Sequence, residues 1–249
     1  MEHEIDFMET WEFGAVGISD PNSSTLKRYF ELVFTTRDIK GDIAEFGVST
    51  GKSLITTSLI SRKLDTNKKI YGFDTFTGFP GYSENDSFNL FEKLFRQGEI
   101  TEDHFSKIEK NREYVLTRGA STNPKDISNS GNFENTSLEL VNSKIQHFGL
   151  DKRIKLIQGD FTKNLELKIS DLLFSLVLID SDLFESYDRI LPTIWERLSP
   201  GGYIYLDEYY SLKFPGPRIA VNSFVTKTKC ELIRLDDWLD FERWAIYKR

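Results

Sequence analysis

The sequence predicts an α/β fold with a seven-stranded, mostly parallel sheet, an antiparallel last strand and helices on both faces. Three observations lead to this expectation. Short apolar runs alternate with helical patterns along most of the 249 residues, which is typical of parallel sheets. Residues 174–180 are almost wholly apolar, as in a strand buried on both faces. Two final runs, residues 230–235 and 243–248, are close enough in sequence to pair as a hairpin.

The first elements form a helix and a βαβ unit. Asn22-Ser23-Ser24-Thr25 is a cluster of N-cap residue types, and the apolar spacing after it predicts a helix with one buried face. This helix belongs to an N-terminal helical segment over about residues 1–40. The βαβ unit that follows implies a parallel sheet, and its parts are a strand at 42–46, a loop at 47–51, a helix at 53–64 and a strand at 69–74.

The alternation is interrupted over about residues 81–149, which are polar and helical only in places. Thr136 and Glu139 have the spacing of a capping box and predict a helix start. A span this long between strands is usually functional, so we expect a cap or lid over the active site, with surface decoration as the alternative. The alternation then resumes with a strand at 154–160, a strand at 174–180, a helix at 185–198, a stop at 199–202 and a strand at 203–207. No linker divides the chain, so residues 1–249 are expected to form one domain.

Composition excludes several classes of protein. The net charge of −7 without a basic stripe argues against a nucleic-acid partner. No apolar run approaches the ~20 residues of a membrane helix, and the N-terminus lacks the features of a signal peptide. The single cysteine suggests a reducing compartment, so we expect a cytoplasmic protein. The aromatic segment around Phe7, Trp11 and Phe13 could pack on a partner subunit, which leaves a homo-oligomer open.

Ligands of parallel sheets bind beyond the carboxyl ends of the strands. The first strand ends in Glu-Phe-Gly-Val-Ser-Thr-Gly-Lys-Ser, residues 45–53, where glycines let backbone approach a ligand at a helix N-terminus. A phosphate-binding P-loop needs four residues between its first glycine and Gly-Lys-Ser, whereas this loop has three, with Phe46 at the glycine position. A P-loop ATPase or kinase that uses Lys52 is therefore the alternative enzyme, and a non-catalytic cofactor-binding protein is the alternative class.

The next two strand ends suit an adenosine. Asp74 ends the second strand, where a carboxylate can accept hydrogen bonds from both hydroxyls of a ribose. Asp160 and Phe161 follow the third strand, where a carboxylate can accept from the adenine amine while the ring packs on the base. Together with the glycine loop they outline an adenosine pocket.

The fourth and fifth strand ends carry acids. Asp180, Asp207 and Glu208 would lie together on adjacent strands, where buried like charges are costly without a partner. A hard divalent cation resolves this conflict, and oxygen ligands favour Mg²⁺, or Mn²⁺ or Ca²⁺. The alternative is that some of these acids pair with basic side chains, the candidates being Arg189, Lys213 and Arg218.

With these motifs, the chain resembles the macrocin O-methyltransferase family, which methylates sugar hydroxyls on natural products. The resemblance runs from about Gly41 to Phe224 and is most specific in Asp-Ser-Asp-Leu-Phe-Glu-Ser, residues 180–186. Its other stretches are residues 42–48, 73–80, 199–209 and 215–218. The resemblance implies a Rossmann-like class I methyltransferase fold, S-adenosylmethionine as cofactor, a divalent metal, and a small-molecule acceptor, expected to be a sugar or glycoside.

The resemblance also implies roles for individual residues. Asp182 would be the general base, with His104 and His147 as alternative bases that we otherwise expect on helix surfaces. The metal would be held by Asp180, Asp207 and Glu208, although the family usually has a second Asp at position 208. S-adenosylmethionine would be bound at the first three strand ends and Asp180, the full set being Glu45, Gly47, Val48, Thr50, Ser53, Asp74, Thr75, Asp160, Phe161 and Asp180.

Overall fold

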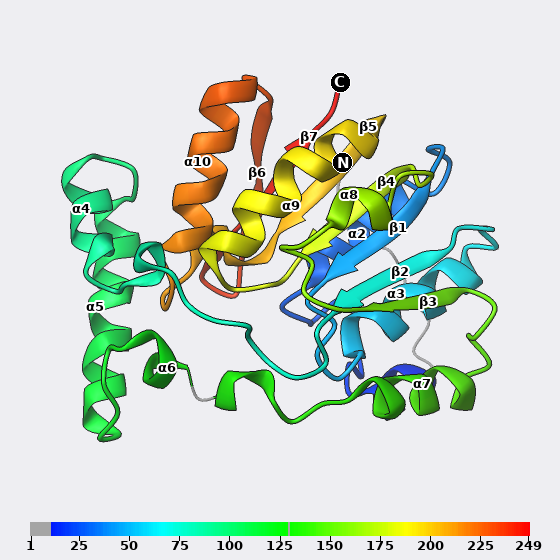
Figure 1. Ribbon diagram of the computed structural model, residues 1–249, viewed down its shortest axis with the longest axis horizontal. Helices are drawn as coiled ribbons and strands as arrows, with labels where there is room; N and C mark the ends of the chain where they lie inside the picture. Colours follow the sequence, from blue (N-terminus) through cyan, green and yellow to red (C-terminus); the bar gives the residue numbers. More distant parts are fainter. Residues whose placement is uncertain (1–10, 129) are drawn as a thin grey trace.

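The computed structural model describes residues 11–128 and 130–249, so residues 1–10 of the expected N-terminal segment, Phe7 among them, lie outside the described residues. A seven-stranded sheet forms the centre, in the order β3-β2-β1-β4-β5-β7-β6 (Figure 1). The strands are β1 (Asp42–Phe46), β2 (Ile70–Asp74), β3 (Ile154–Gln158), β4 (Phe174–Ile179), β5 (Leu198–Leu206), β6 (Glu231–Trp238) and β7 (Phe241–Tyr247).

The first five strands pair in parallel, and β7 is antiparallel to both of its neighbours. This arrangement confirms the predicted sheet and its antiparallel last strand. The chain builds outward from β1 to β3 on one side and from β4 onward on the other. The gap between the carboxyl ends of β1 and β4 is therefore the topological switch point, where ligands of such sheets bind.

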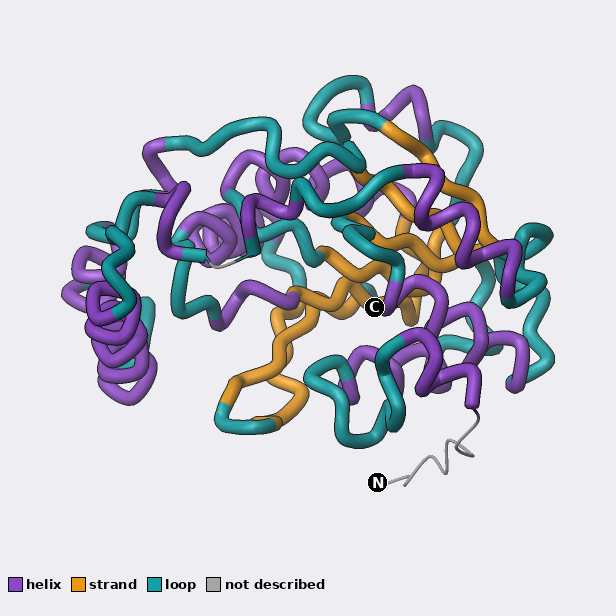
Figure 2. The backbone as a smooth tube through the Cα atoms, turned by 90° about the horizontal axis from the view of Figure 1, so that it is seen from below, coloured by secondary structure: helices purple, strands orange, loops and turns teal. Residues whose placement is uncertain are grey.

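Helices cover both faces of the sheet (Figure 2). Because strand side chains alternate, Ile43 of β1 packs with the helices of one face and Phe46 with those of the other. The first face has α1 (Trp11–Val16), α2 (Lys27–Thr35), α3 (Lys52–Lys63) and α7 (Leu138–His147). The second face has α8 (Leu165–Lys168), α9 (Phe184–Arg197) and α10 (Gly216–Thr228).

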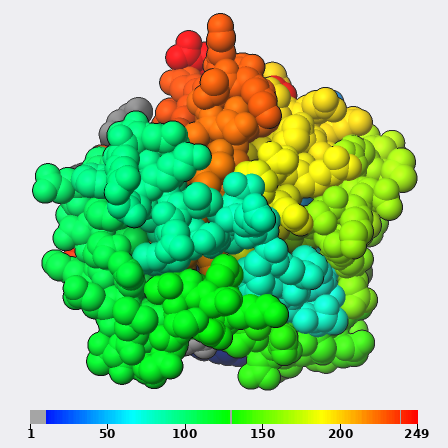
Figure 3. All heavy atoms as spheres, turned by 60° about the vertical axis from the view of Figure 1, so that its left-hand side comes forward, coloured from blue at the N-terminus to red at the C-terminus, as the bar shows by residue number. Residues whose placement is uncertain are grey.

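Residues 84–133, which we call the lobe, extend from one end of the sheet (Figure 1). The lobe holds η1 (Glu84–Asp86), α4 (Leu90–Arg96), α5 (Glu102–Thr117), α6 (Pro124–Ile127) and η2 (Gly131–Phe133). It has its own apolar cluster, which Leu183 and Phe214 join from the body of the protein. Its atoms cover much of the face seen in Figure 3, next to α10. In contrast, α7 lies within the expected insert but packs in the main core through Val141 and Ile145.

Two local expectations were wrong. Residues 199–202 do not separate helix from strand, because β5 already begins at Leu198 and takes up the extra residues in a register shift against β4. The N-cap of α7 is Ser137, whose hydroxyl accepts from the Leu140 N–H, while the Thr136 hydroxyl donates to the Ser49 carbonyl. Among the described helices, none is both long and apolar enough to cross a membrane.

Candidate active site

The loop after β1 passes against the end of β4. A Cβ atom on Gly47 would lie 1.7 Å from the Asp180 carbonyl oxygen, and the φ of Gly47 is +93°. Only glycine accepts both the contact and the conformation. The Asp180 N–H donates to the Phe46 carbonyl at 2.9 Å, so the two strand ends are joined where the chain crosses the switch point.

Asp74 organises the same loop from β2. Its carboxylate accepts from the Ser49 N–H at 2.8 Å and from the Phe76 N–H at 2.6 Å. A segment of the expected insert also holds this loop, since the Lys144 ammonium of α7 donates to the Thr50 carbonyl at 2.7 Å. The predicted residues Gly47, Thr50 and Asp74 therefore lie in one hydrogen-bonded unit.

Glu45 lies inside the protein, fully shielded from solvent. The Ser53 hydroxyl donates to Glu45 Oε1 at 2.7 Å, whereas Oε2 has no partner among the described residues. Burial raises the pKa of Glu45 well above its ordinary value, Ser53 lowers it, and Asp180 and Asp74 raise it further. A buried, unpartnered carboxylate oxygen is costly, and a cationic ligand group would satisfy it.

A pocket opens beside these residues. Gly47, Asp74, Thr75 and Asp180 contribute to its polar wall. Its apolar wall includes Phe161, as predicted, and three residues that sequence reasoning missed, namely Phe79, Pro80 and Phe133. The Phe79 N–H donates to the Asn132 carbonyl at 3.1 Å, and the rings of Phe79 and Phe133 are 5.2 Å apart. The lobe thus supplies part of the pocket wall, and no local pattern around Phe133 signalled it.

Five of the predicted cofactor residues are not part of this lining, namely Glu45, Val48, Thr50, Ser53 and Asp160. The Asp160 carboxylate accepts from the Thr162 N–H at 2.9 Å and pairs with Lys163 at 3.0 Å. Burial raises the pKa of Asp160, but these hydrogen bonds outweigh it and the pKa is lowered. Val48 belongs to the loop, but its side chain is buried in the core next to α3 and points away from the pocket lining. Lys52, which a P-loop would require, is exposed and does not line the pocket.

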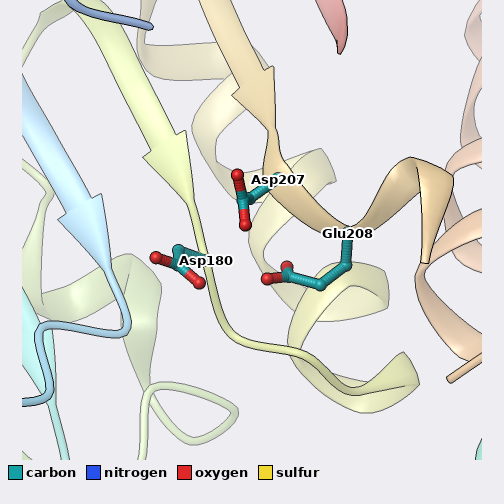
Figure 4. A group of neighbouring side chains, drawn as sticks. All are labelled: Asp180, Asp207 and Glu208. Carbon is teal, nitrogen blue, oxygen red and sulfur yellow. The ribbon is translucent and has the colours of Figure 1, made fainter. Parts of the chain in front are cut away.

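The three acids predicted as metal ligands meet at the ends of β4 and β5 (Figure 4). One carboxylate oxygen from each of Asp180, Asp207 and Glu208 lies within 4.8 Å of the others. Burial raises the pKa of all three, and for Asp180 the neighbouring Asp207 is the next cause. Such a cluster of hard oxygen donors fits a divalent cation.

Two other side chains contact the acids of the cluster. The Tyr187 hydroxyl, which the sequence did not single out, donates to Glu208 Oε2 at 2.6 Å. Arg243 lies 3.7 Å from Asp207 and is the one basic group that pairs with the cluster among the described residues. Two of the three cations proposed as alternatives are engaged elsewhere, since Arg189 pairs with Glu166 and Arg218 donates to two backbone carbonyls. The third, Lys213, acts through its charge on Asp182.

Asp182 is next to the cluster and lines the pocket. Its φ of +59° is unusual for a residue with a side chain, which is a sign of a constrained turn. Burial raises the pKa of Asp182 to about 7; Lys213 lowers it, and Asp207 and Asp86 raise it. A carboxyl group with a pKa near neutrality, in a pocket, has the properties of a general base.

His104 was expected on a helix surface, and this was wrong. Only 2% of it is exposed, its ring stacks on Tyr210 at 3.8 Å, and its Nε2 is 2.9 Å from the Ser211 carbonyl oxygen. It joins α5 of the lobe to the segment after Glu208. His147 is exposed, as expected.

The strand order, with the glycine loop after β1 and Asp74 at the end of β2, matches the Rossmann-like class I methyltransferase fold. A model of the macrocin O-methyltransferase family matches residues 103–243, more than half of the chain. The chain belongs to this family, as its motifs had indicated.

Two curated relatives are both 24% identical to the chain. One is the 8-demethyl-8-(2,3-dimethoxy-alpha-L-rhamnosyl)-tetracenomycin-C 4'-O-methyltransferase of Streptomyces olivaceus, aligned over 69% of this chain and 54% of that protein. The other is the demethyldecarbamoylnovobiocin O-methyltransferase of Streptomyces niveus, over 80% and 64%. The chain thus spans between about half and two thirds of the length of these relatives.

Solved structures share the fold. The O-methyltransferase NovP superposes with a TM-score of 0.63 at 20% identity, over 90% of this chain and 79% of that one. The calicheamicin methyltransferase CalS11 superposes with a TM-score of 0.60 at 20% identity, over 88% and 77%.

Proposed function

We propose that this protein transfers a methyl group from S-adenosylmethionine to a hydroxyl of a sugar or glycoside, with help from a divalent cation. The observation that carries the proposal is the position of Asp180. It lines the pocket at the switch point and also belongs to the three-acid cluster. A cofactor in the pocket and a cation at the cluster would therefore be neighbours.

The residues present fit the cofactor. Asp74 and Phe161 both line the pocket, where Asp74 would accept hydrogen bonds from the ribose and the Phe161 ring would pack on the base. Glu45 offers a buried, unpartnered oxygen, and Gly47 is part of the pocket wall. S-adenosylmethionine would supply the methyl group already activated as a sulfonium. The work left to the protein is to orient the acceptor hydroxyl and remove its proton.

The cluster and Asp182 would share that work. Asp180, Asp207 and Glu208 would hold Mg²⁺ or a similar cation, which would stabilise the negative charge that develops on the acceptor oxygen. Asp182 would accept the proton of the hydroxyl as the O–CH₃ bond forms and the S–CH₃ bond breaks. General base catalysis of this kind contributes about 10²–10⁴-fold.

The acceptor class rests on the relatives, whose names include a rhamnosyl tetracenomycin and demethyldecarbamoylnovobiocin. Carbohydrate hydroxyls are weak nucleophiles, so their methylation would need both the base and the cation that we propose for this site. We therefore propose a small sugar or glycoside rather than a nucleic acid, and the net charge of −7 supports this choice.

Calorimetric titration with S-adenosylmethionine and with ATP, each with and without Mg²⁺, tests the cofactor. Micromolar binding of S-adenosylmethionine without ATP binding is expected. Formation of S-adenosylhomocysteine is then measured with TDP-rhamnose, methyl rhamnoside and methyl glucoside as acceptors. ATP binding without S-adenosylmethionine binding would reject the proposal.

The P-loop alternative depends on Lys52, so Lys52→Ala separates the two functions. The side chain lies outside the pocket, and we expect the variant to bind S-adenosylmethionine within about twofold of the unmodified protein. A P-loop enzyme would instead lose ATP binding. The comparison is made in the same calorimetric titrations.

Asp182→Asn tests the base. The variant should keep cofactor binding and lose about 10²–10⁴-fold in kcat, because an amide cannot accept the proton. Asp188→Asn, an exposed acid on α9, is the matched control and should retain full turnover. An Asp182→Asn enzyme with unchanged kcat would remove this residue from the chemistry.

A further inference from the structure

Asp86 in the lobe is a buried carboxylate with three donors. Only 1% of the residue is exposed. Its Oδ2 accepts from the Ser83 N–H at 2.9 Å and from the Ser83 hydroxyl at 2.8 Å, which fixes its orientation within η1. Its Oδ1 accepts from the N–H of Phe184, 98 residues away, at 2.8 Å. The carboxylate thus joins the lobe to the first residue of α9.

That hydrogen bond replaces a missing helix cap. The N-cap position of α9 is Leu183, which makes no side-chain cap, and leucine is among the poorest residues at this position. The first N–H groups of a helix need acceptors, and a negative charge there is favourable. Asp86 provides both from a distant part of the chain.

Gly216 makes room for this arrangement. A Cβ atom at Gly216, the first residue of α10, would lie 2.2 Å from Asp86 Oδ1 and 2.7 Å from Phe184 Cβ. The carboxylate therefore lies beside the N-terminus of α10 as well as that of α9. Three elements meet at one carboxylate, so its removal would loosen their packing.

The residues just before α9 form the turn that carries Asp182. The Leu183 N–H donates to the Ser181 carbonyl at 2.7 Å, and Asp182 has a φ of +59°. Such backbone persists only when neighbouring contacts hold it in place. The Asp86 bond is one residue beyond Leu183 and anchors the far end of this turn.

We propose that Asp86 is a positioning residue for the reaction, holding the turn that carries Asp182 in place from the lobe. This inference rests on the proposed function for the role of Asp182. Asp86 would not touch the reacting atoms. Its effect would be on kcat, because a small displacement of a catalytic group is enough to lower the rate about 10²-fold.

The test compares Asp86→Ala with Asp86→Asn, which keeps one acceptor oxygen for the Phe184 N–H. Hydrogen exchange of a peptide spanning residues 181–186 is measured by mass spectrometry, together with kcat, KM and calorimetric binding of S-adenosylmethionine. Thr101→Ala is the matched control, since Thr101 caps α5 in the same lobe through the His104 N–H, away from this turn. Ser83→Ala is a milder variant that removes a single donor to Asp86.

For Asp86→Ala we expect at least tenfold faster exchange in the turn, a 10–100-fold lower kcat and cofactor binding within twofold of the unmodified protein. Asp86→Asn should retain most of the protection from exchange and most of kcat. Ser83→Ala should slightly raise the exchange rate and slightly lower kcat, as Asp86→Ala does to a larger extent. Unchanged exchange, or a loss of kcat no larger than that of Thr101→Ala, would overturn the proposal. If no acceptor is methylated by the unmodified protein, the proposed function fails, while exchange still decides whether Asp86 holds the turn.

Discussion

Gly47 has the strictest steric requirement of the residues around the pocket. Its missing side chain lets β1 and β4 approach until a Cβ would be 1.7 Å from the Asp180 carbonyl oxygen. The obstacle is backbone, which cannot rotate away as a side chain could. The same closeness brings the loop after β1 beside Asp180, which is part of both the pocket and the acid cluster.

Gly47→Ala should therefore lower the free energy of unfolding by more than about 3 kcal/mol, through overpacking and backbone strain together. Gly149→Ala is the matched control, because Gly149 has a φ of +63° but no atom within 4 Å of its would-be Cβ. Gly149→Ala should lower the free energy of unfolding by only about 1 kcal/mol. Urea unfolding of both variants measures the two losses. Equal losses would show that the positive φ alone, and not the close contact with Asp180, sets the cost at Gly47.

At the scale of elements, α5 braces the segment that follows the acid cluster. His104 bonds to the Ser211 carbonyl, and the Asn111 amide donates to the Leu212 carbonyl at 3.0 Å. Arg218 of α10 donates to the Glu99 carbonyl at 2.8 Å, just before α5. These contacts link the lobe to the residues that follow η3 (Asp207–Tyr210), the element that carries two of the three acids.

We expect His104 of α5 to make the free energy of unfolding depend on pH. Burial, followed by the charge of Arg218, lowers the pKa of His104 from 6.5 to about 4. Between these values the unfolded chain binds a proton and the folded protein does not, so stability falls as the pH drops below 6.5. From pH 7 to pH 5 this residue should remove about 2 kcal/mol from the free energy of unfolding.

His104→Gln removes that contribution while leaving the other titrating groups in place. Its loss of stability between pH 7 and pH 5, measured by urea unfolding, should be about 2 kcal/mol smaller than that of the unmodified protein. His147→Gln, on the exposed face of α7, is the control. Identical pH profiles for all three proteins would contradict the assignment.

On the scale of the whole molecule, three acids of a negatively charged chain come together at one edge of the sheet. The chain has a net charge of −7, and Asp180, Asp207 and Glu208 meet beside the pocket. The lobe, the two strand ends and α9 all converge there. A cation at this point would therefore favour the folded protein over the unfolded chain.

Mg²⁺ should raise the melting temperature at constant ionic strength. At a concentration of about 100 times Kd the gain is about 2.7 kcal/mol, or roughly 5–10 °C for a chain of this size. Glu208→Gln should lose this response, and Asp171→Asn, an exposed acid elsewhere, should keep it. An equal response in Glu208→Gln would place the effect outside the cluster. Scanning calorimetry provides the measurement.

The strand ends could be predicted because their signals are local. An apolar run that stops at an acid identifies a buried strand and its carboxyl end, as at Asp74 and Asp180. Once the sheet is parallel, those ends must share one edge, so the meeting of Asp180 with Asp207 and Glu208 followed from the sequence alone. Gly47 was identified from the glycine loop that follows the first strand and from the family resemblance.

The tertiary structure decided what depends on contacts between distant segments. It brought Phe133 into the pocket wall, buried His104 against Ser211 and started β5 at Leu198 through a register shift with β4. It also supplied α9 with a cap from Asp86, 98 residues earlier. No periodicity or spacing encodes such pairs, because each partner is locally unremarkable. Their proximity is set by how the lobe folds back on the sheet, whereas the sheet and its acids are set by patterns within single elements.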